Sequence, residues 1–180
     1  MTDKMLEAFA GTRKAGSIAS GALDEVAKII NPGVTTEQID KLCYDFINDH
    51  KAYSAPLFYR GYPKSCCTST NHVVCHGIPK DKFLSEGDIV NVDVTALKDG
   101  WHGDTSRMYF VGEVSTKAKK LVKTTYEAMS KSIKILKNGI QVGDIGSVIQ
   151  KHVESQGFSV VRDFCGHGTG KNFHQPPNIL

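Results

Sequence analysis

Residues 87–111 constrain the fold most, because they alternate like two strands joined by a tight turn. Valines at every second position share one face of the first strand, while Asp93 and Thr95 share the other. The dipeptide Asp99-Gly100 favours a short hairpin loop. We therefore expect an antiparallel hairpin whose return strand covers residues 101–111.

Asp93 and Asp104 fall on this hairpin within reach of each other. If Lys98 and Asp99 form the loop, the two carboxylates lie directly opposite each other. If Asp99 and Gly100 form it, they are diagonal neighbours. Like charges that face each other across a sheet are destabilising, so the arrangement indicates a cation between them. Spacing alone leaves an alternative open, namely a solvated hairpin with two unrelated acids.

The composition narrows the class of protein. A length of 180 residues suits a single domain that buries roughly 70% of its unfolded surface. The net charge of +3 is too small to indicate specific nucleic-acid binding. No apolar run approaches a membrane span, and the N-terminus lacks the apolar core of a signal peptide. The five cysteines lack paired spacing, which argues against a disulfide framework or a zinc ribbon. We expect a cytoplasmic protein.

The region before the hairpin is expected to be mainly helical. Residues 6–30 form one predicted helix, which Asn31-Pro32-Gly33 ends. Thr35 and Gln38 have the spacing of a capping box and begin a second helix. Residues 65–74 are a predicted strand. The apolar face of the second helix comprises Ile39, Leu42, Cys43, Phe46 and Ile47.

Two more amphipathic helices are predicted after the hairpin, over residues 117–137 and 144–156. Residues 158–164 are expected to form a strand, and no regular element is expected after Pro177. The chain is thus expected to be a mixed α/β (α+β) protein. The apolar stripe of the first of these helices comprises Val122, Tyr126, Met129, Ile133 and Leu136. That of the second comprises Ile145, Val148, Ile149, His152 and Val153.

Two of the seven histidines bear on the acidic pair. His167 lies among three glycines, which let the backbone approach whatever the imidazole contacts. Together with Asp93 and Asp104 it makes an oxygen-rich ligand set with one nitrogen, which suits Mn, Fe, Co or Zn. His102 lies next to the pair, but we expect a regular strand to direct it away from Asp104, which leaves its role open.

Several motifs occur together and in order: Tyr62-Pro63-Lys64-Ser65, residues 71–79, Gly103-Asp104-Thr105-Ser106 and Gly166-His167-Gly168-Thr169-Gly170. In combination they closely resemble the type I methionine aminopeptidases. These enzymes have the pita-bread fold that they share with prolidase and creatinase. The resemblance implies that residues 1–180 form the N-terminal portion of that fold, as a single, C-terminally incomplete catalytic domain.

The resemblance also implies an activity. The family removes the initiator methionine from nascent polypeptides when the second residue is small, and it uses two divalent metal ions. By this resemblance, Asp93 binds one ion, Asp104 bridges both, and His167 ligates the other. The partner is then the N-terminal methionine of nascent chains near the ribosome. A cytoplasmic monomer is implied, with no membrane and no specific nucleic acid.

The resemblance assigns roles to five further residues. His76 and His174 match the two histidines that position the scissile amide and stabilise its tetrahedral intermediate. Three further residues match those that form the walls of the family's pocket for the methionine side chain, namely Tyr59, Tyr62 and Phe173. A cysteine often found in that wall is replaced here by Pro56.

The sequence departs from the family in one important respect. The family completes its metal site with two glutamates further along the chain, one of which is the general base. The sequence ends at Leu180 before either occurs, and no earlier glutamate lies in a matching motif. We therefore interpret the chain as an N-terminal fragment with little or no activity.

Two other interpretations remain open at this point. One is a prolidase-like or creatinase-like hydrolase, because these enzymes share the metal-ligand pattern. The other is a non-catalytic binding module that uses the same fold to hold a protein or RNA. Retention of Asp93, Asp104 and His167 argues against the binding module, whereas the missing glutamates favour it.

Overall fold

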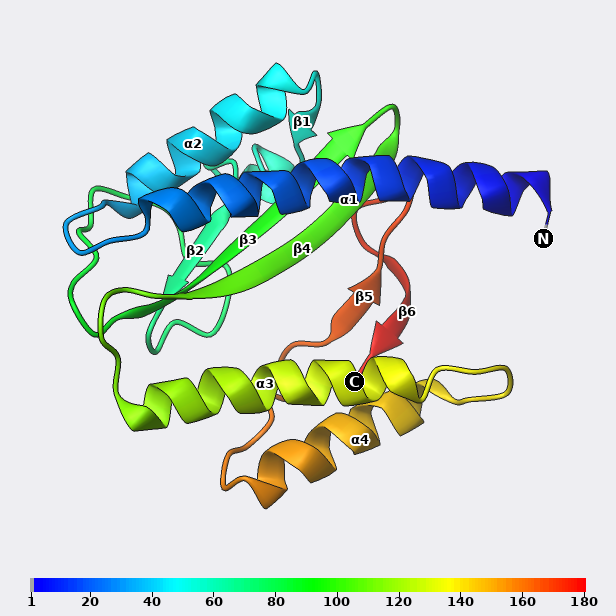
Figure 1. Cartoon of the computed structure of the whole chain (residues 1–180). Coiled ribbons are helices and arrows are strands. Elements are labelled where there is room, and N and C mark those ends of the chain that lie inside the picture. Colours follow the sequence, from blue (N-terminus) through cyan, green and yellow to red (C-terminus); the bar gives the residue numbers. More distant parts are fainter. Residues whose placement is uncertain (1) are drawn as a thin grey trace. The chain divides into compact units, whose positions relative to one another are not determined.

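The structure is a computed structural model that describes residues 2–180 and groups them into two compact units (Figure 1). The first unit contains the chain up to Val114 together with Thr169–Phe173, and the second contains Ser115–Gly168 and His174–Leu180. Each unit combines helices with strands, which confirms the expected mixed class. No helix among the described residues has the length and apolar character needed to cross a membrane.

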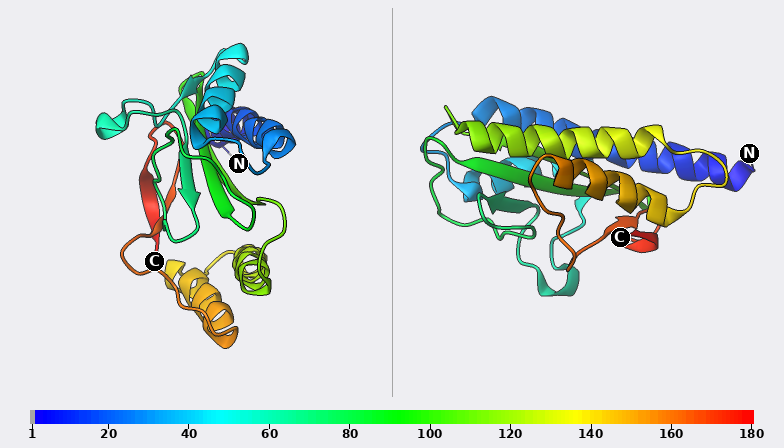
Figure 2. Two further views of the ribbon diagram at one scale, coloured as in Figure 1. Left: turned by 90° about the vertical axis from the view of Figure 1, so that its left-hand side faces the viewer. Right: turned by 90° about the horizontal axis from the view of Figure 1, so that it is seen from below.

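The first unit is built around a four-stranded antiparallel sheet. Strand β3 pairs with β4 along one edge and with both β1 and β2 along the other. Helices α1 and α2 lie on the same side of the β3–β4 hairpin (Figure 2). The elements are α1 (Asp3–Ile29), α2 (Thr36–Asp49), β1 (Tyr53–Ser54), a 3-10 helix (Tyr59–Gly61), β2 (Cys67–Thr70), β3 (Ile89–Lys98) and β4 (Trp101–Phe110).

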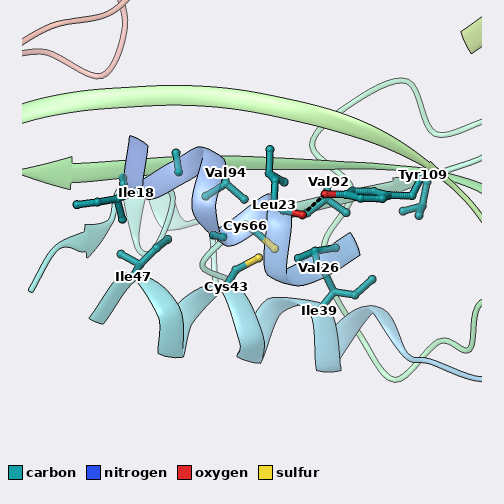
Figure 3. Close-up of a cluster of buried hydrophobic side chains, with 14 of the residues drawn as sticks. Ile18, Leu23, Val26, Ile39, Cys43, Ile47, Cys66, Val92, Val94 and Tyr109 are labelled. Atoms are coloured by element: carbon teal, nitrogen blue, oxygen red, sulfur yellow. Dashed lines mark hydrogen bonds between the residues drawn. The ribbon is translucent and has the colours of Figure 1, made fainter. Parts of the chain in front are cut away.

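The core of this unit lies between the helices and one face of the sheet (Figure 3). Val90, Val92 and Val94 of β3 are fully buried there, as the alternation of the sequence predicted. The Tyr109 hydroxyl donates a hydrogen bond of 2.6 Å to the Leu23 carbonyl, so β4 is also bonded to α1. Because this face is apolar, the polar residues of β3 are left on the opposite face.

Helix α2 begins where its capping signal predicts, whereas α1 begins at Asp3, earlier than the expected residue 6. Thr35 and Gln38 form the expected capping box, in which Thr35 Oγ1 accepts from Gln38 N at 3.2 Å and Gln38 Oε1 accepts from Thr35 N at 2.8 Å. On the predicted face of α2, Ile39, Cys43 and Ile47 are fully buried. Strand β2 is shorter than the 65–74 expected, because only Cys67–Thr70 pairs with β3.

The hairpin turn decides the register of β3 and β4. Asp99 and Gly100 have φ of 51° and 80°, and two positive values are what a two-residue type I′ loop requires. Asp93 is consequently opposite Ser106, and Asp104 is opposite Thr95. The diagonal arrangement of the two carboxylates is thereby confirmed, and the direct opposition expected from a Lys98-Asp99 loop is wrong.

The second unit contains α3 (Thr116–Lys134), α4 (Val142–Ser155), β5 (Gly166–Gly168) and β6 (Gln175–Ile179), and its two strands pair antiparallel. The prediction of a strand at residues 158–164 is wrong, and so is the absence of regular structure after Pro177. A strand needs a partner for its backbone, and periodicity alone cannot show where that partner lies. Here the glycine-flanked His167 segment, for which no strand was predicted, pairs with β6.

The apolar stripe of α3 is not buried as its periodicity predicted. Tyr126, Met129 and Ile133 of α3 and Leu136 just beyond its end are between 47% and 66% exposed. The buried positions of the helix are Thr124, Ala128 and Ser132. The small and polar face of α3 therefore packs inside the unit. Periodicity locates an apolar face correctly but cannot show whether anything covers it.

Candidate functional site

Asp93 and Asp104 lie on the face of the sheet opposite the apolar core. They occupy diagonal positions on neighbouring strands, where the Cα atoms of such a pair lie about 7–8 Å apart and long side chains can reach each other. Both are partly buried, so the repulsion between the carboxylates is less screened than at an open surface. The pair is thus a local concentration of negative charge.

Thr95 orients one of these carboxylates. Its Oγ1 donates a hydrogen bond of 2.9 Å to Asp104 Oδ1, and Thr95 itself is only 2% exposed. The two residues are directly opposite in the register, so the hairpin turn determines this contact. The sequence placed Thr95 on the same face as Asp93, but only the register showed that it faces Asp104.

Two thiols lie beside the acidic pair. Cys67 of β2 is directly opposite Asp93, and burial, reinforced by the charge of Asp93, raises the pKa of Cys67 to about 11. Burial and the charge of Asp93 also raise the pKa of Cys75. Sequence analysis missed Cys67, because the pairing of β2 with β3 joins distant segments and leaves no local signal.

Tyr62 links the segment that leads into β2 to the loop that contains Gly77. Its hydroxyl, shared between two acceptors, donates to the carbonyls of Cys66 and Gly77, each at 3.0 Å. Burial is the main reason that the pKa of Tyr62 is raised well above its ordinary value, so the hydroxyl remains a donor at neutral pH. The contact links the aromatic segment before β2 to the loop that carries His76.

The backbone at His76 is held in an unusual conformation. Its φ of 54° lies in the left-handed region, which is costly for a residue other than glycine. The next residue anchors the loop, because Gly77 O accepts from Thr68 N at 2.8 Å and Gly77 N donates to Ser69 Oγ at 3.1 Å. A Cβ on Gly77 would collide with the Thr68 carbonyl, so only glycine allows this close approach.

A buried carboxylate holds the chain that leads from Tyr62 into β2. Asp40 of α2 is 8% exposed and accepts hydrogen bonds from Ser65 N (2.8 Å), Ser65 Oγ (2.6 Å) and Cys66 N (3.0 Å). Three donors compensate the burial of the charge. Helix α2 therefore helps to place both Tyr62 and Cys67.

Phe173 contacts two rings of the first unit. Its ring lies 4.9 Å from the Tyr59 ring, tilted by 55°, and 5.6 Å from the His102 imidazole, nearly parallel at 11°. Two of the three residues assigned to a methionine pocket are thus in contact. An apolar thioether packs well on such rings.

His102 lies on the same face as Asp104, because residues two apart in the regular strand β4 point the same way. The expectation that it points away from Asp104 is therefore wrong. Its backbone N and its Nδ1 donate to the Gly170 carbonyl at 2.8 and 3.0 Å, since a carbonyl can only accept. In neutral His102 the second nitrogen, Nε2, therefore carries no proton.

His167 and His174 lie in the second unit. Their rings are 4.3 Å apart and tilted by 45°, and the β5–β6 pairing includes a bulge between His167 and Gly168. The structure thus brings the two histidines together in one unit and the two aspartates together in the other. Within residues 2–180, no three His, Cys, Asp or Glu side chains gather closely enough to hold a metal ion.

The chemistry of the acidic pair nevertheless fits a divalent cation. Carboxylate oxygens are hard ligands that suit Mg, Mn or Fe, and imidazole nitrogen extends the range to Co and Zn. The Thr95 hydroxyl orients Asp104 in the way that outer partners orient metal ligands. Asp93 and Asp104 are the residues of this face that could hold such an ion.

Comparison with known proteins shows a close likeness over nearly the whole chain. Residues 10–180 match the model of metallopeptidase family M24. The methionine aminopeptidase of Rickettsia prowazekii is 54% identical over 172 residues, which cover 96% of this chain and 66% of that protein. The chain therefore spans just under two thirds of the length of this curated relative.

Solved structures agree with the sequence match. The crystal structure of the Rickettsia prowazekii methionine aminopeptidase superimposes with a TM-score of 0.96 at 52% identity, covering 100% of this chain and 71% of that chain. That of Thermotoga maritima gives 0.95 at 40% identity, covering 99% and 71%. The prolidase of Pyrococcus furiosus, at 22% identity, has a TM-score of 0.82 over 96% of this chain and 50% of its own, and shows likeness of fold alone. The expected pita-bread fold is confirmed.

Proposed function

Because the chain belongs to metallopeptidase family M24, we propose that it is the metal-binding part of an aminopeptidase that removes N-terminal methionine from polypeptides whose second residue is small. The observation that carries this proposal is the diagonal Asp93–Asp104 pair on the polar face of the β3–β4 hairpin. Relatives at 40–54% identity are named methionine aminopeptidase, which supports the choice of substrate.

Asp93 and Asp104 would hold two divalent ions together with His167, with Asp104 shared between them. When bound, such ions activate water and polarise the scissile carbonyl. The donor set suits Mn, Fe, Co or Zn. The Thr95 hydroxyl would hold the Asp104 carboxylate in one rotamer, so that its oxygens are already oriented for the ions.

Other side chains would bind and orient the substrate. His76 and His174 would donate hydrogen bonds that position the scissile amide and stabilise the developing oxyanion, an effect worth about 3 kcal/mol in comparable sites. Tyr59, Tyr62 and Phe173 would form the walls that accept the methionine side chain. The Tyr59–Phe173 contact supports this role, because it places two rings where a thioether could pack.

In this proposal residues 1–180 act as one catalytic domain of a cytoplasmic monomer, and the partners are nascent polypeptides near the ribosome. The family resemblance adds two glutamate ligands that have no counterpart in these 180 residues. We therefore expect the chain by itself to bind metal more weakly, and to hydrolyse peptides more slowly, than its longer relatives.

Metal titration tests the proposal directly. We expect calorimetry to find Mn²⁺ or Co²⁺ binding that Asp93→Asn and Asp104→Asn each abolish. Asp45→Asn is the matched control, because Asp45 is an exposed acid on α2 that pairs with Lys41 at 2.7 Å. Absence of metal binding by the unaltered chain would overturn the proposal and favour the non-catalytic binding module.

The substrate class is tested by peptide hydrolysis. With Mn²⁺ present, we expect slow release of methionine from a Met-Ala-Ser peptide and no cleavage of an Ala-Pro peptide. Preferential cleavage of Xaa-Pro bonds would instead identify a prolidase-like enzyme.

A further inference from the structure

Helices α3 and α4 of the second unit are joined by a buried histidine. His152 of α4 is 9% exposed, and both of its ring nitrogens contact side chains of α3. Nδ1 lies 2.7 Å from Lys131 Nζ, and Nε2 lies 3.0 Å from Glu127 Oε2. A single imidazole therefore bridges a cation and an anion that are one helical turn apart on the same helix.

The chemistry of the two partners determines where the proton of His152 lies. An ammonium group can only donate and an ionised carboxylate can only accept. Nδ1 must therefore accept from Lys131, and Nε2 must carry the proton that is donated to Glu127. The network consequently requires neutral His152 in its Nε2–H tautomer.

Few apolar side chains of these two helices are fully buried. The buried residues of α3 are Thr124, Ala128 and Ser132, and those of α4 are His152 and Val153. Non-directional burial of so few apolar groups leaves rotation and sliding of one helix against the other weakly specified. Directional hydrogen bonds to a buried imidazole specify both.

The docking of α4 matters because the histidine-bearing hairpin lies against it. Gly146 of α4 approaches the carbonyl of Leu180 so closely that a Cβ would collide with it, and Leu180 directly follows β6. Strand β6 in turn pairs with β5, where His167 is opposite Asn178. A shift of α4 along α3 would therefore displace His167 and its neighbour His174.

We propose that His152, held between Lys131 and Glu127, is a positioning residue that sets the docking of α4 on α3 and thereby the placement of His167. The assignment of His167 as a metal ligand rests on the proposed function, whereas the network and its tautomer do not. Lys123, 3.9 Å from Glu127 across one turn of α3, is a further charge beside the network. On α4, the Ser155 hydroxyl donates to the His152 carbonyl at 2.7 Å.

Nitrogen-15 NMR of the full chain tests the tautomer. We expect long-range proton–nitrogen spectra at pH 7.5 to show His152 with protonated Nε2 and unprotonated Nδ1. A protonated Nδ1 would overturn the proposal, because the contact with Lys131 could not then exist. This measurement needs neither metal nor activity.

Substitution tests the positioning role. His152→Leu fills the space without hydrogen bonds, and we expect it to move the imidazole signals of His167 and His174 and to weaken Mn²⁺ binding about 10-fold or more. His152→Gln should restore both, because its amide can accept from Lys131 and donate to Glu127. Unchanged His167 signals in His152→Leu, or no rescue by His152→Gln, would refute the role.

Two further variants keep the result interpretable. His50→Leu is the matched control, because the His50 imidazole lies in the first unit and contacts the Phe46 carbonyl of the preceding helix, through Nδ1 at 2.8 Å. It should leave the His167 signals unchanged. If His152→Leu fails to fold, Lys131→Met at an exposed position should still shift them in the same direction. Loss of Mn²⁺ binding in the unaltered chain would refute the proposed function alone.

Discussion

Each of the two units contains a pair of helices followed along the chain by antiparallel strands, but the units bury their helices differently. In the first unit, Leu23 of α1 and Ile39 of α2 are at most 1% exposed against the four-stranded sheet. In the second, Ile133 of α3 is 57% exposed, and the strands amount to a short two-stranded pair. Similar amphipathic patterns therefore lead to different burial.

The difference shows what each unit relies on. The first unit is stabilised by apolar area removed from water, about 25 cal/mol per Å². The second relies more on directional contacts, such as the bridge through His152 and the hydrogen bond of 2.8 Å from Lys120 Nζ to the Gln156 carbonyl. An amphipathic helix contributes burial only when a partner surface is present.

Truncation of a core leucine should produce the largest effect. Leu23→Ala is expected to lower the free energy of unfolding by about 2–5 kcal/mol, whereas Ile133→Ala should change it by less than about 0.5 kcal/mol. Urea unfolding can be followed by the fluorescence of the single tryptophan, Trp101, which lies in the first unit, and by circular dichroism. Equal losses in the two variants would contradict the contrast between the units.

The buried thiol of Cys67 in the first unit should react more slowly than the exposed thiol of Cys165 in the second. Because the pKa of Cys67 is raised to about 11, only about 0.1% of it is thiolate at pH 8. With a chelator present, we expect iodoacetamide to modify the exposed Cys165 at least about 100-fold faster, as measured by mass spectrometry. Comparable rates would show that the β2–β3 face is open.

The raised pKa of Cys67 also predicts the sign of a pH effect. The folded chain holds this proton more tightly than an unfolded thiol, whose pKa is about 8.5. The resulting stabilisation is complete below about pH 8.5 and is lost as the pH rises towards 11. Cys67→Ser should reduce the fall in stability over this range, which denaturant titrations at several pH values would measure.

An intermediate effect is expected at the acidic pair. Thr95→Val removes the hydroxyl that orients Asp104 and should weaken Mn²⁺ binding by about 10–100-fold. Thr95→Ser keeps the hydroxyl and should retain most of the affinity in the same calorimetric titration. If valine and serine weaken binding equally, packing rather than the hydrogen bond is what Thr95 contributes.

The smallest effect is expected from a glycine of the second unit. No described atom lies within 4 Å of where a Cβ on Gly143 in α4 would be, so Gly143→Ala should stabilise the chain by about 0.5–1 kcal/mol. In the first unit, a Cβ on Gly103 would collide with the backbone of α1 at Ala15 and Gly16. Gly103→Ala should therefore destabilise by about 1–3 kcal/mol in thermal unfolding.

Local signals predicted most elements correctly where a short stretch of chain determines the structure. The Thr35–Gln38 capping box and the Asp99-Gly100 turn are examples, because caps and tight turns depend on neighbouring residues alone. The predicted strand at residues 158–164 and the unpredicted strand at Gly166–Gly168 are the counterexample. Residues 166–168 form a strand because they pair with β6, and the periodicity of a segment does not show which distant segment it pairs with.

In the candidate site, too, local motifs were predictable from the sequence, whereas contacts between distant segments were not. The motifs around Asp93, Asp104 and His167 indicated the family from the sequence, and the comparisons confirm it. The sequence could not show that Cys67 is opposite Asp93, or that His102 shares the face of Asp104 and bonds Gly170. Each of these depends on strand register or on a contact between distant segments.

By itself, the sequence determined the fold class and the family, because residue type, turn chemistry and motif order are properties of the chain. The residues that we propose to carry the chemistry were predicted from the same motifs. The tertiary structure alone decided which apolar faces are covered, as Leu23 and Ile133 show, and which donor orients Asp104. The physical reason is that burial and hydrogen bonding between distant residues depend on the partner surface that the folded chain brings to them.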